Sequence, residues 1–507
     1  MLKPTDEDPS EPLETFDIQR FVLSSHSRLK CSGYRLLRVT AQAAARRWLA
    51  AQVDDVTTAE SRENEQPWAL QIAFTHAGLA ALGLSDDALK GFPNCFSDGM
   101  ASDRRARILG DDGASAPERW DWGGPDTKPV HVLLLCFGSD EHELLDQLNF
   151  RTPIHSDGIE DVKTLTAGRE PGDNREHFGF VDGVGQPVIA GSGLGQRQYE
   201  RTAHATIIPA GEVILGYRDF SGAQAPFPTV ANADDPLSIL PVAPVHDRGI
   251  SVRRDFGRNG TYLVFRQLEQ DVAGFWRAVR DAANHLWPND PNAITKLAAK
   301  LVGRWPSGAP LVLFHVRDPG AGLMRAACHG APPVAPDHEE PRNDFTYAHD
   351  DPHGLHCPLG AHIRRANPRD MLGTDGDKAL SSANRHRLLR RGRSYGSRIV
   401  DPFVHDGKPR GLYFICLNGD LERQFEFVQQ SWLNNPAFAG LRAEVDPLIG
   451  KHPGSTGMFT IPADPLRNRI PDVRSHVTTK GGAYWFLPGL RALRFLTRVI
   501  PDTSGSS

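Results

Sequence analysis

Three segments in the first third of the chain share one pattern of apolar and polar residues. Each begins with an apolar run rich in β-forming residues, continues through a polar junction, and ends with apolar residues at helical spacing. The pattern predicts strand–helix pairs at 34–39 with 41–53, at 68–74 with 77–84, and at 130–137 with 144–148. Ser139 precedes the third helix as a candidate N-cap, followed by Glu141 and Glu143 in the first turn.

The same pattern returns in the second half of the chain. It predicts a strand at 260–268 before a helix at about 271–286, a strand at 411–417 before a helix at about 420–432, and a last strand at 483–487. The glycine-rich stretches lack the full GxGxxG spacing between a strand and a helix, so a dinucleotide-binding fold is not indicated. The sequence therefore predicts an α+β protein of two related domains, each a sheet with helices packed on one face.

Composition and charge narrow the class of protein. The 507 residues are enough for at least two domains. A net charge of −5, from 57 Lys and Arg against 62 Asp and Glu, argues against a nucleic-acid or anionic-membrane binder. Six widely spaced cysteines favour reduced thiols over a disulfide framework. The first residues lack the features of a signal peptide, and no apolar run reaches the ~20 residues that span a bilayer, so we expect a cytoplasmic protein.

Two segments place polar residues among glycines or histidines. Residues 177–187 surround Asp182 with glycines, which let the backbone approach a bound group, although an isolated Asp-Gly pair is more often a turn. Residues 353–369 hold three histidines and a cysteine within ten positions, but Pro358 and Gly360 interrupt the spacing of zinc ligands. A haem iron, by contrast, needs only one histidine on an apolar wall.

Two further segments lie downstream. Residues 385–396 concentrate five arginines, which alone indicate either a solvated basic loop or an anion site. Residues 411–432 predict a buried strand followed by an amphipathic helix, with Asp420 near the start of the helix.

Together these four segments resemble those of the dye-decolorising peroxidases, haem enzymes built from two ferredoxin-like domains. Gly179-Phe-Val-Asp-Gly183 matches the GxxDG motif of the family, 362–369 resembles its proximal-histidine segment, and 390–396 resembles its distal-arginine segment. Segments 259–264 and 303–311 also resemble family segments, and the long insertion between Arg317 and Asp351 is similar to the larger branch of the family.

The resemblance implies a division of the chain into two ferredoxin-like domains. The N-terminal domain would span 16–222 and carry the GFVDG motif, and the C-terminal domain, which mainly holds the haem, would span 223–500. Residues 1–15 and 501–507 would be tails.

The resemblance also implies roles for residues beside a haem b, one per chain. His362 would be the axial ligand of the iron, and Asp420 is the candidate carboxylate that accepts a hydrogen bond from its Nδ1. Glu422 and Glu426 are alternatives, because a shift of a few residues in the alignment exchanges them with Asp420. Asp420 as a simple helix cap is the remaining interpretation.

On the other haem face, the resemblance implies Asp182 as the general acid–base and Arg390 as the cation that stabilises charge during cleavage of the peroxide O–O bond. The residues expected to line the haem are Gly183, Val184, Asn367, Pro368, Arg369 and Arg390, with Arg369 as a partner of a propionate.

The implied activity is the oxidation of aromatic donors, such as phenols and dyes, by hydrogen peroxide. Large dyes cannot enter a pocket sized for peroxide, so an aromatic relay is one route for their electrons, and Tyr395, Tyr413 and Trp432 are nearest in sequence to the site segments. The alternatives are a haem-binding or iron-handling protein with incidental peroxidase activity, and a scaffold with remnant motifs. The presence of both Asp182 and Arg390 favours the enzyme. The resemblance also leaves room for a homo-oligomer.

Overall fold

The computed structural model of the chain describes residues 11–61, 66–152, 157–168, 174–193, 206–244, 252–320, 343–451 and 457–498. Its centre is a nine-stranded antiparallel sheet with the order β10-β12-β9-β15-β2-β3-β1-β4, and β11 pairs with β12 beside β10. The strands are β1 (Cys31–Val39), β2 (Trp68–Phe74), β3 (Val132–Gly138), β4 (Ile159–Gly168), β9 (Thr261–Gln270), β10 (Leu389–Arg390), β11 (Arg393–Tyr395), β12 (Gly411–Asn418) and β15 (Val477–Leu487).

The sheet repeats one strand order in its two halves. The first half runs β2-β3-β1-β4, and the second half runs β10-β12-β9-β15, so in each the first strand in sequence lies between the third and the fourth. This order is that of a ferredoxin-like unit, and it confirms the predicted α+β class with antiparallel sheets. The halves join through a single backbone pair between Phe74 of β2 and Phe486 of β15.

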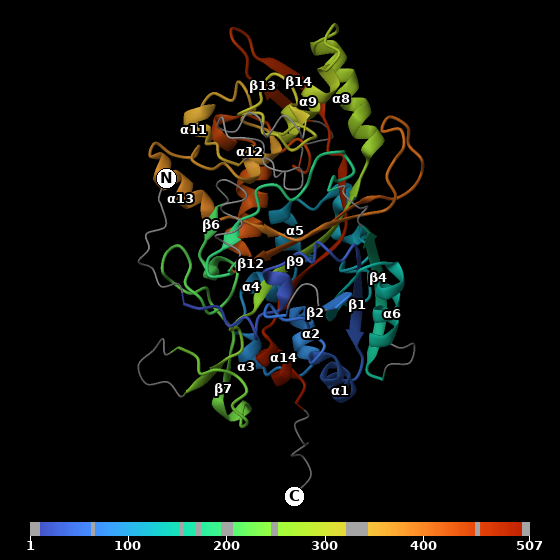
Figure 1. The fold of residues 1–507 in the computed structure, drawn as a ribbon, viewed down its shortest axis with the longest axis vertical. Helices are drawn as coiled ribbons and strands as arrows, with labels where there is room; N and C mark the ends of the chain where they lie inside the picture. The colour runs from blue at the N-terminus through green and yellow to red at the C-terminus, as the bar shows by residue number, and fades with distance from the viewer. Residues whose placement is uncertain are drawn as a thin grey trace, which may run out of the picture.

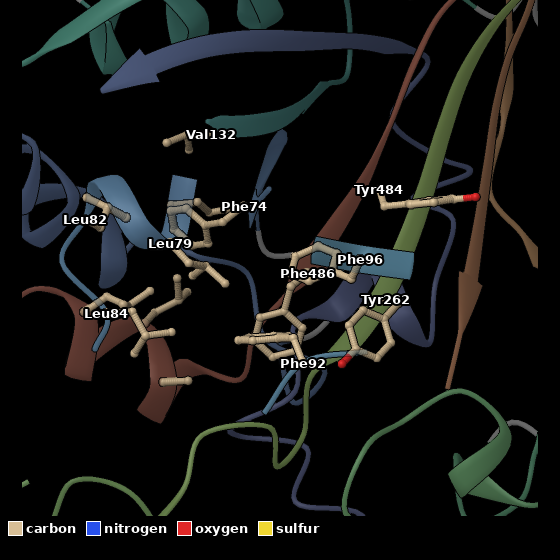
Figure 2. Close-up of a cluster of buried hydrophobic side chains, with 14 of the residues drawn as sticks. Phe74, Leu79, Leu82, Leu84, Phe92, Phe96, Val132, Tyr262, Tyr484 and Phe486 are labelled. Atoms are coloured by element: carbon tan, nitrogen blue, oxygen red, sulfur yellow. The ribbon is translucent and has the colours of Figure 1, made fainter. Parts of the chain in front are cut away.

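Helices cover one face of this sheet. α1 (Gln42–Val53), α6 (Glu141–Arg151) and α14 (Leu490–Leu496) pack there against apolar residues of β1, β2, β3, β9 and β15. Aromatic rings fill this core at the junction of the halves (Figure 2). The ring centres of Phe92 and Phe486 lie 5.3 Å apart, and those of Phe96 and Tyr262 lie 5.5 Å apart. Such ring pairs contribute roughly 0.5–1.5 kcal/mol each beyond the apolar area that they bury.

A second group of elements lies at one end of the sheet. α8 (Val272–Leu286), α9 (Ala293–Val302), the hairpin of β13 (Gly457–Ile461) and β14 (Asn468–Val473), and α12 (His362–Ala366) gather at the upper end in Figure 1, away from α1 and α14. The Asp271 side chain caps α8 by accepting a 2.9 Å hydrogen bond from the Gly274 N–H. The apolar stripe of α8 packs against α9 and this hairpin rather than on the sheet.

The remaining elements are short. They are α2 (His76–Ala81), α3 (Asp86–Leu89), α4 (Asn94–Asp98), α5 (Asp103–Leu109), α11 (Tyr347–Asp350), α13 (Gly376–Asn384), and the paired strands β5 (Val188–Ile189) with β6 (Ile207–Ile208) and β7 (Thr229–Ala231) with β8 (Arg253–Asp255). Among the described residues, no helix has both the length and the apolar character needed to cross a bilayer.

Three local features differ from the predictions. The N-cap of α6 is Asp140, whose side chain accepts from the Glu143 N–H at 2.9 Å, and Ser139 only donates to Asp140. The helix predicted at 420–432 is present but has π-helical turns, η6 (Glu422–Glu426) and η7 (Val428–Leu433). The apolar pattern did not predict β4, an edge strand with one partly exposed face.

The five cysteines in the described ranges are free thiols.

Candidate active site

A cavity of about 650 Å³ lies on the helix-covered face of the second half of the sheet. Its volume is within the roughly 300–1,000 Å³ typical of sites for small molecules and cofactors. One wall comes from β9 and β12, a second from α12 and η7, and a third from residues 176–185, which follow the first half of the sheet. His362, Asp182 and Arg390, predicted from separate motifs, all line this one cavity.

His362 is the first residue of α12 and is held by a buried carboxylate. Its Nδ1 lies 2.9 Å from Oδ2 of Asp446, whose side chain is fully buried, while 27% of the His362 side chain is exposed. The other carboxylate oxygen of Asp446 accepts from the N–H groups of Leu448 and Ile449 at 3.0 and 2.9 Å. Within the part of the chain that the structure describes, Nε2 of His362 makes no hydrogen bond. This nitrogen is therefore available to a ligand in the cavity.

Electrostatics favour an ionised Asp446. Burial alone would raise the pKa of its carboxyl group, but the charge and hydrogen bond of His362, the Ile449 N–H and the charge of Arg365 together lower that pKa. A carboxylate that accepts the Nδ1 proton fixes the imidazole tautomer and makes Nε2 a more electron-donating ligand.

The prediction of Asp420 as the partner of His362 is wrong, and so are the alternatives Glu422 and Glu426. Asp420 caps the following helix, because its Oδ1 accepts from the Arg423 N–H at 2.9 Å. Glu426 accepts from Tyr484 and Arg105, and Glu422 pairs with Arg105. These contacts turn all three carboxylates toward other elements, and Asp446 takes the role instead.

Arg365 ties the segment that bears Asp446 to η7. The fully buried guanidinium donates to the carbonyl oxygens of Trp432 and Asn435 at 2.8 and 3.1 Å, and to the carbonyl of Glu444 two residues before Asp446. Because Arg365 lies on α12 with His362, one helix positions both the imidazole and the loop of its carboxylate partner.

Asp182 lies at the end of a hairpin, residues 174–183, that we call the Asp182 hairpin. Its N–H donates to the carbonyl of Asn174 at 2.8 Å, and its Oδ1 accepts from the Gly183 N–H at 2.6 Å. Gly183 has a φ of 85°, a conformation that favours glycine. The side chain of Asp182 is exposed to the cavity, so its second oxygen can reach a small molecule there.

Arg390 is positioned by β10 and by the segment that follows Asp182. In β10 it pairs with Cys416 of β12, its N–H donates to Oε1 of Gln186 at 3.0 Å, and its Nη2 donates to the carbonyl of Val184 at 3.2 Å. The structure thus brings Arg390 and Asp182 to adjoining parts of the cavity wall, although 208 positions separate the two residues in the sequence (390 − 182).

Arginines crowd one region of the wall. Arg304, Arg369 and Arg387 line the cavity together with Arg390. Burial and the charges of neighbouring arginines lower the pKa of both Arg304 and Arg387 to about 9. Nε of Arg387 is buried with no hydrogen-bond partner among the described residues. Such a cluster of positive charges is typical of a site that binds an anionic group.

Arg369 has a strained backbone held by its side chain. Its φ is 52°, while its guanidinium donates to the carbonyls of Asn343 and Phe345 and lies 3.8 Å from the centre of the Phe345 ring. Asn367 also lines the cavity, but Pro368 is buried outside the lining, so the prediction that Pro368 contacts the bound group is not supported. Pro368 instead ends α12 by restricting the residue before it.

The candidate relay residues do not line the cavity. Tyr395 and Tyr413 are buried in the core on the opposite face of the sheet, where their rings stack 4.4 Å apart. The ring of Trp432 packs against those of His386 and Phe427, with ring centres 5.2 and 5.4 Å away. Each has a packing role that accounts for its burial.

Comparison with known proteins shows what the chain is similar to. A family model described as the DyP dimeric alpha+beta barrel domain matches residues 33–171. The multifunctional dye peroxidase DyP2 of an Amycolatopsis species is 30% identical over 397 residues, which are 75% of this chain and 74% of that protein. The dye-decolorizing peroxidase msp1 of Mycetinis scorodonius is 28% identical over 85% of this chain and 77% of its own length.

The fold is similar to that of a solved relative as well. The structure of an ancestral D-type dye decolorizing peroxidase superposes with a TM-score of 0.75 at 26% identity, covering 96% of this chain and all of that one. The 30% identity with DyP2 over 75% of this chain, together with this similarity of fold, shows that the chain belongs to the dye-decolorizing peroxidase family and is a DyP-type peroxidase.

Proposed function

We propose that the cavity binds one haem b per chain, with His362 Nε2 as the axial ligand of the iron. The residues present fit this group: an imidazole nitrogen that makes no hydrogen bond to any described residue, apolar walls, and arginines whose charge two propionates would balance. Arg369 and Arg387 are the proposed propionate partners, because their guanidinium groups line the same region of the cavity. When bound, the haem supplies the iron that accepts two oxidising equivalents from hydrogen peroxide and passes them on singly.

In this proposal, Asp182 moves a proton and Arg390 stabilises charge. Asp182 takes the proton from one oxygen of hydrogen peroxide and returns it to the oxygen that leaves as water. The guanidinium of Arg390 stabilises the negative charge on the departing oxygen. The observation that carries this proposal is that His362, held by the buried Asp446, lines the same cavity as Asp182 and Arg390.

The proposed reducing substrates are aromatic donors, including phenols and dyes. The names of the relatives support this class, since both DyP2 and msp1 are described as dye peroxidases. The alternative of a haem-binding or iron-handling protein has less support, because a carrier needs neither a distal carboxylate nor a distal cation.

One experiment tests the proposed function. We expect the chain expressed with haem to show a Soret band that shifts within seconds of adding one equivalent of hydrogen peroxide in a stopped-flow spectrophotometer. A phenol or dye should then return the original spectrum. A Soret band that does not respond to peroxide would support haem handling, and a protein that takes up no haem would contradict both functions.

The Asp446–His362 hydrogen bond gives a separate prediction. Replacing Asp446 with Asn keeps the size of the side chain but removes the charge that holds the Nδ1 proton. Loss of such a partner typically costs 10- to 100-fold in metal affinity or activity. We expect haem to transfer to apomyoglobin about tenfold faster or more from this variant than from the parent. Replacing Asp420 with Asn is the control, and an equal effect of both changes would contradict the pairing seen here.

A further inference from the structure

Glu176 lies on the cavity wall and has no role in the function proposed above. Its carboxylate accepts three hydrogen bonds: Oε2 accepts from the Phe178 N–H at 2.8 Å and from Nε2 of Gln270 at 2.7 Å, and Oε1 accepts from the Phe180 N–H at 2.9 Å. The carboxylate thus fills the turn of the Asp182 hairpin and anchors it to β9, the strand of Gln270.

The bonding pattern of Glu176 is that of a carboxylate that accepts hydrogen bonds. A carboxylate only accepts hydrogen bonds, whereas the protonated acid has a proton that would need an acceptor, and both Glu176 oxygens face N–H donors. All three donors are uncharged, so this negative charge is balanced by dipoles rather than by a cation. Burial raises the pKa of the Glu176 carboxyl group, and the three hydrogen bonds lower it. The nearby charge of Asp182 also raises it, so the pKa lies above its ordinary value.

The turn that Glu176 fills determines the course of the backbone to Asp182. The N–H of Glu176 donates to the Phe180 carbonyl at 3.0 Å, and the hairpin closes where the Asp182 N–H donates to the Asn174 carbonyl. The Phe178 ring packs 4.5 Å from that of Phe275 on α8, outside the carboxylate contacts. Without the Glu176 carboxylate, the N–H groups of Phe178 and Phe180 would lose their acceptor.

We propose that Glu176 is a positioning residue for Asp182: its carboxylate holds the hairpin that presents Asp182 to peroxide, and its negative charge acts on the neighbouring Asp182 carboxyl group. This proposal rests on the proposed function, because it assumes that Asp182 is the acid–base group. Positioning within a fraction of an ångström matters for such a group, since small displacements of a catalytic side chain cost large factors in rate.

Other ionisable groups pack against the same hairpin. Nε2 of His177 lies 2.7 Å from the Tyr395 carbonyl, Arg398 donates to the Arg175 carbonyl, and Arg390 donates to Val184 just after the hairpin. Along the cavity wall, Arg304 and Arg387 add positive charge. Glu176 brings a negative charge to this hairpin, close to Asp182.

The test is the variant Glu176→Gln in the haem-loaded protein. The amide has the same shape but no charge, and its NH₂ group cannot accept from the backbone. We expect the limiting rate with hydrogen peroxide to fall about tenfold or more, and the acid limb of its pH profile to move about 0.5–1 pH unit lower. Without peroxide, hydrogen exchange at the amides of Phe178 and Phe180 should accelerate at least tenfold.

Matched variants separate charge from position. Glu269→Gln removes a carboxylate from the neighbouring position on β9, outside the cavity lining, and should leave the rate, the pH profile and the exchange unchanged. Glu176→Asp keeps the charge but is too short to fill the turn, so it should lower the rate and keep the parent pH profile. Haem content and circular dichroism report folding for each variant.

Two outcomes would overturn the proposal. One is a Glu176→Gln protein with parent rate, parent pH profile and parent hydrogen exchange. The other is faster exchange with an unchanged pH profile, which would leave a purely structural role. Failure of the proposed function has a different signature, since an Asp182→Asn variant would then react with peroxide as fast as the parent.

Discussion

Replacing Asp182 with Asn should slow the reaction with hydrogen peroxide by about 10²- to 10⁴-fold without loss of haem. The amide occupies the same space at the end of the Asp182 hairpin but cannot accept a proton, and positioned proton transfer is worth factors of this size. The Asp182 N–H bond to Asn174 involves only backbone atoms, so the hairpin should persist in the variant. The measurement is the rate of the Soret change after mixing with peroxide.

A carboxylate outside the cavity provides the control for this variant. Asp377 is exposed on α13, so Asp377→Asn changes the net charge equally and should react at the parent rate. If the Asp182→Asn protein reacted as fast as this control, proton transfer by Asp182 would be excluded.

The second large effect is expected from replacing His362 with Ala, which should reduce haem occupancy after purification below about a tenth of the parent value. The change removes the proposed axial nitrogen and leaves the buried Asp446 carboxylate without its His362 partner, and a buried charge that loses its partner is strongly destabilising. Occupancy follows from the ratio of Soret absorbance to protein absorbance, and circular dichroism shows whether the chain still folds.

The matched control uses a histidine from the same stretch of sequence. His353 is exposed and lies nine positions before His362 (362 − 353), so His353→Ala should keep full haem occupancy. Partial recovery of the His362→Ala protein by added imidazole would support loss of the ligand as the cause. A full Soret band with unaltered iron ligation in His362→Ala would show that another residue binds the iron.

Much of the fold could be predicted because its signals are local. The apolar run from Trp68 to Phe74 predicts the full length of β2. Similar runs predict β9 and β12 to within two residues at each end, and the last part of β15. Apolar periodicity reports burial directly, so strands in the centre of a sheet are the easiest to find. The edge strand β4 was missed because polar residues interrupt its apolar positions.

The candidate site also contains some residues that the sequence predicts and others that it does not. Asp182, His362 and Arg390 lie within motifs whose residues are contiguous, and the structure brings all three to one cavity. Asp446 is 84 residues from His362 and carries no such motif, because its position depends on the tertiary contacts of Arg365 with η7 and Glu444. Glu176 could have been noticed six positions before Asp182, but only the fold shows that its carboxylate turns back onto its own backbone.

The single backbone pair between β2 and β15 has a consequence for how the protein is made. An unpaired strand edge is a template for aggregation, and β15 is both long and apolar over its last five residues, Ala483 to Leu487. β15 is also the last strand in sequence, so β9 and β2 have already left the ribosome when it emerges. This long strand is therefore synthesised only when both of its neighbours are available to receive it.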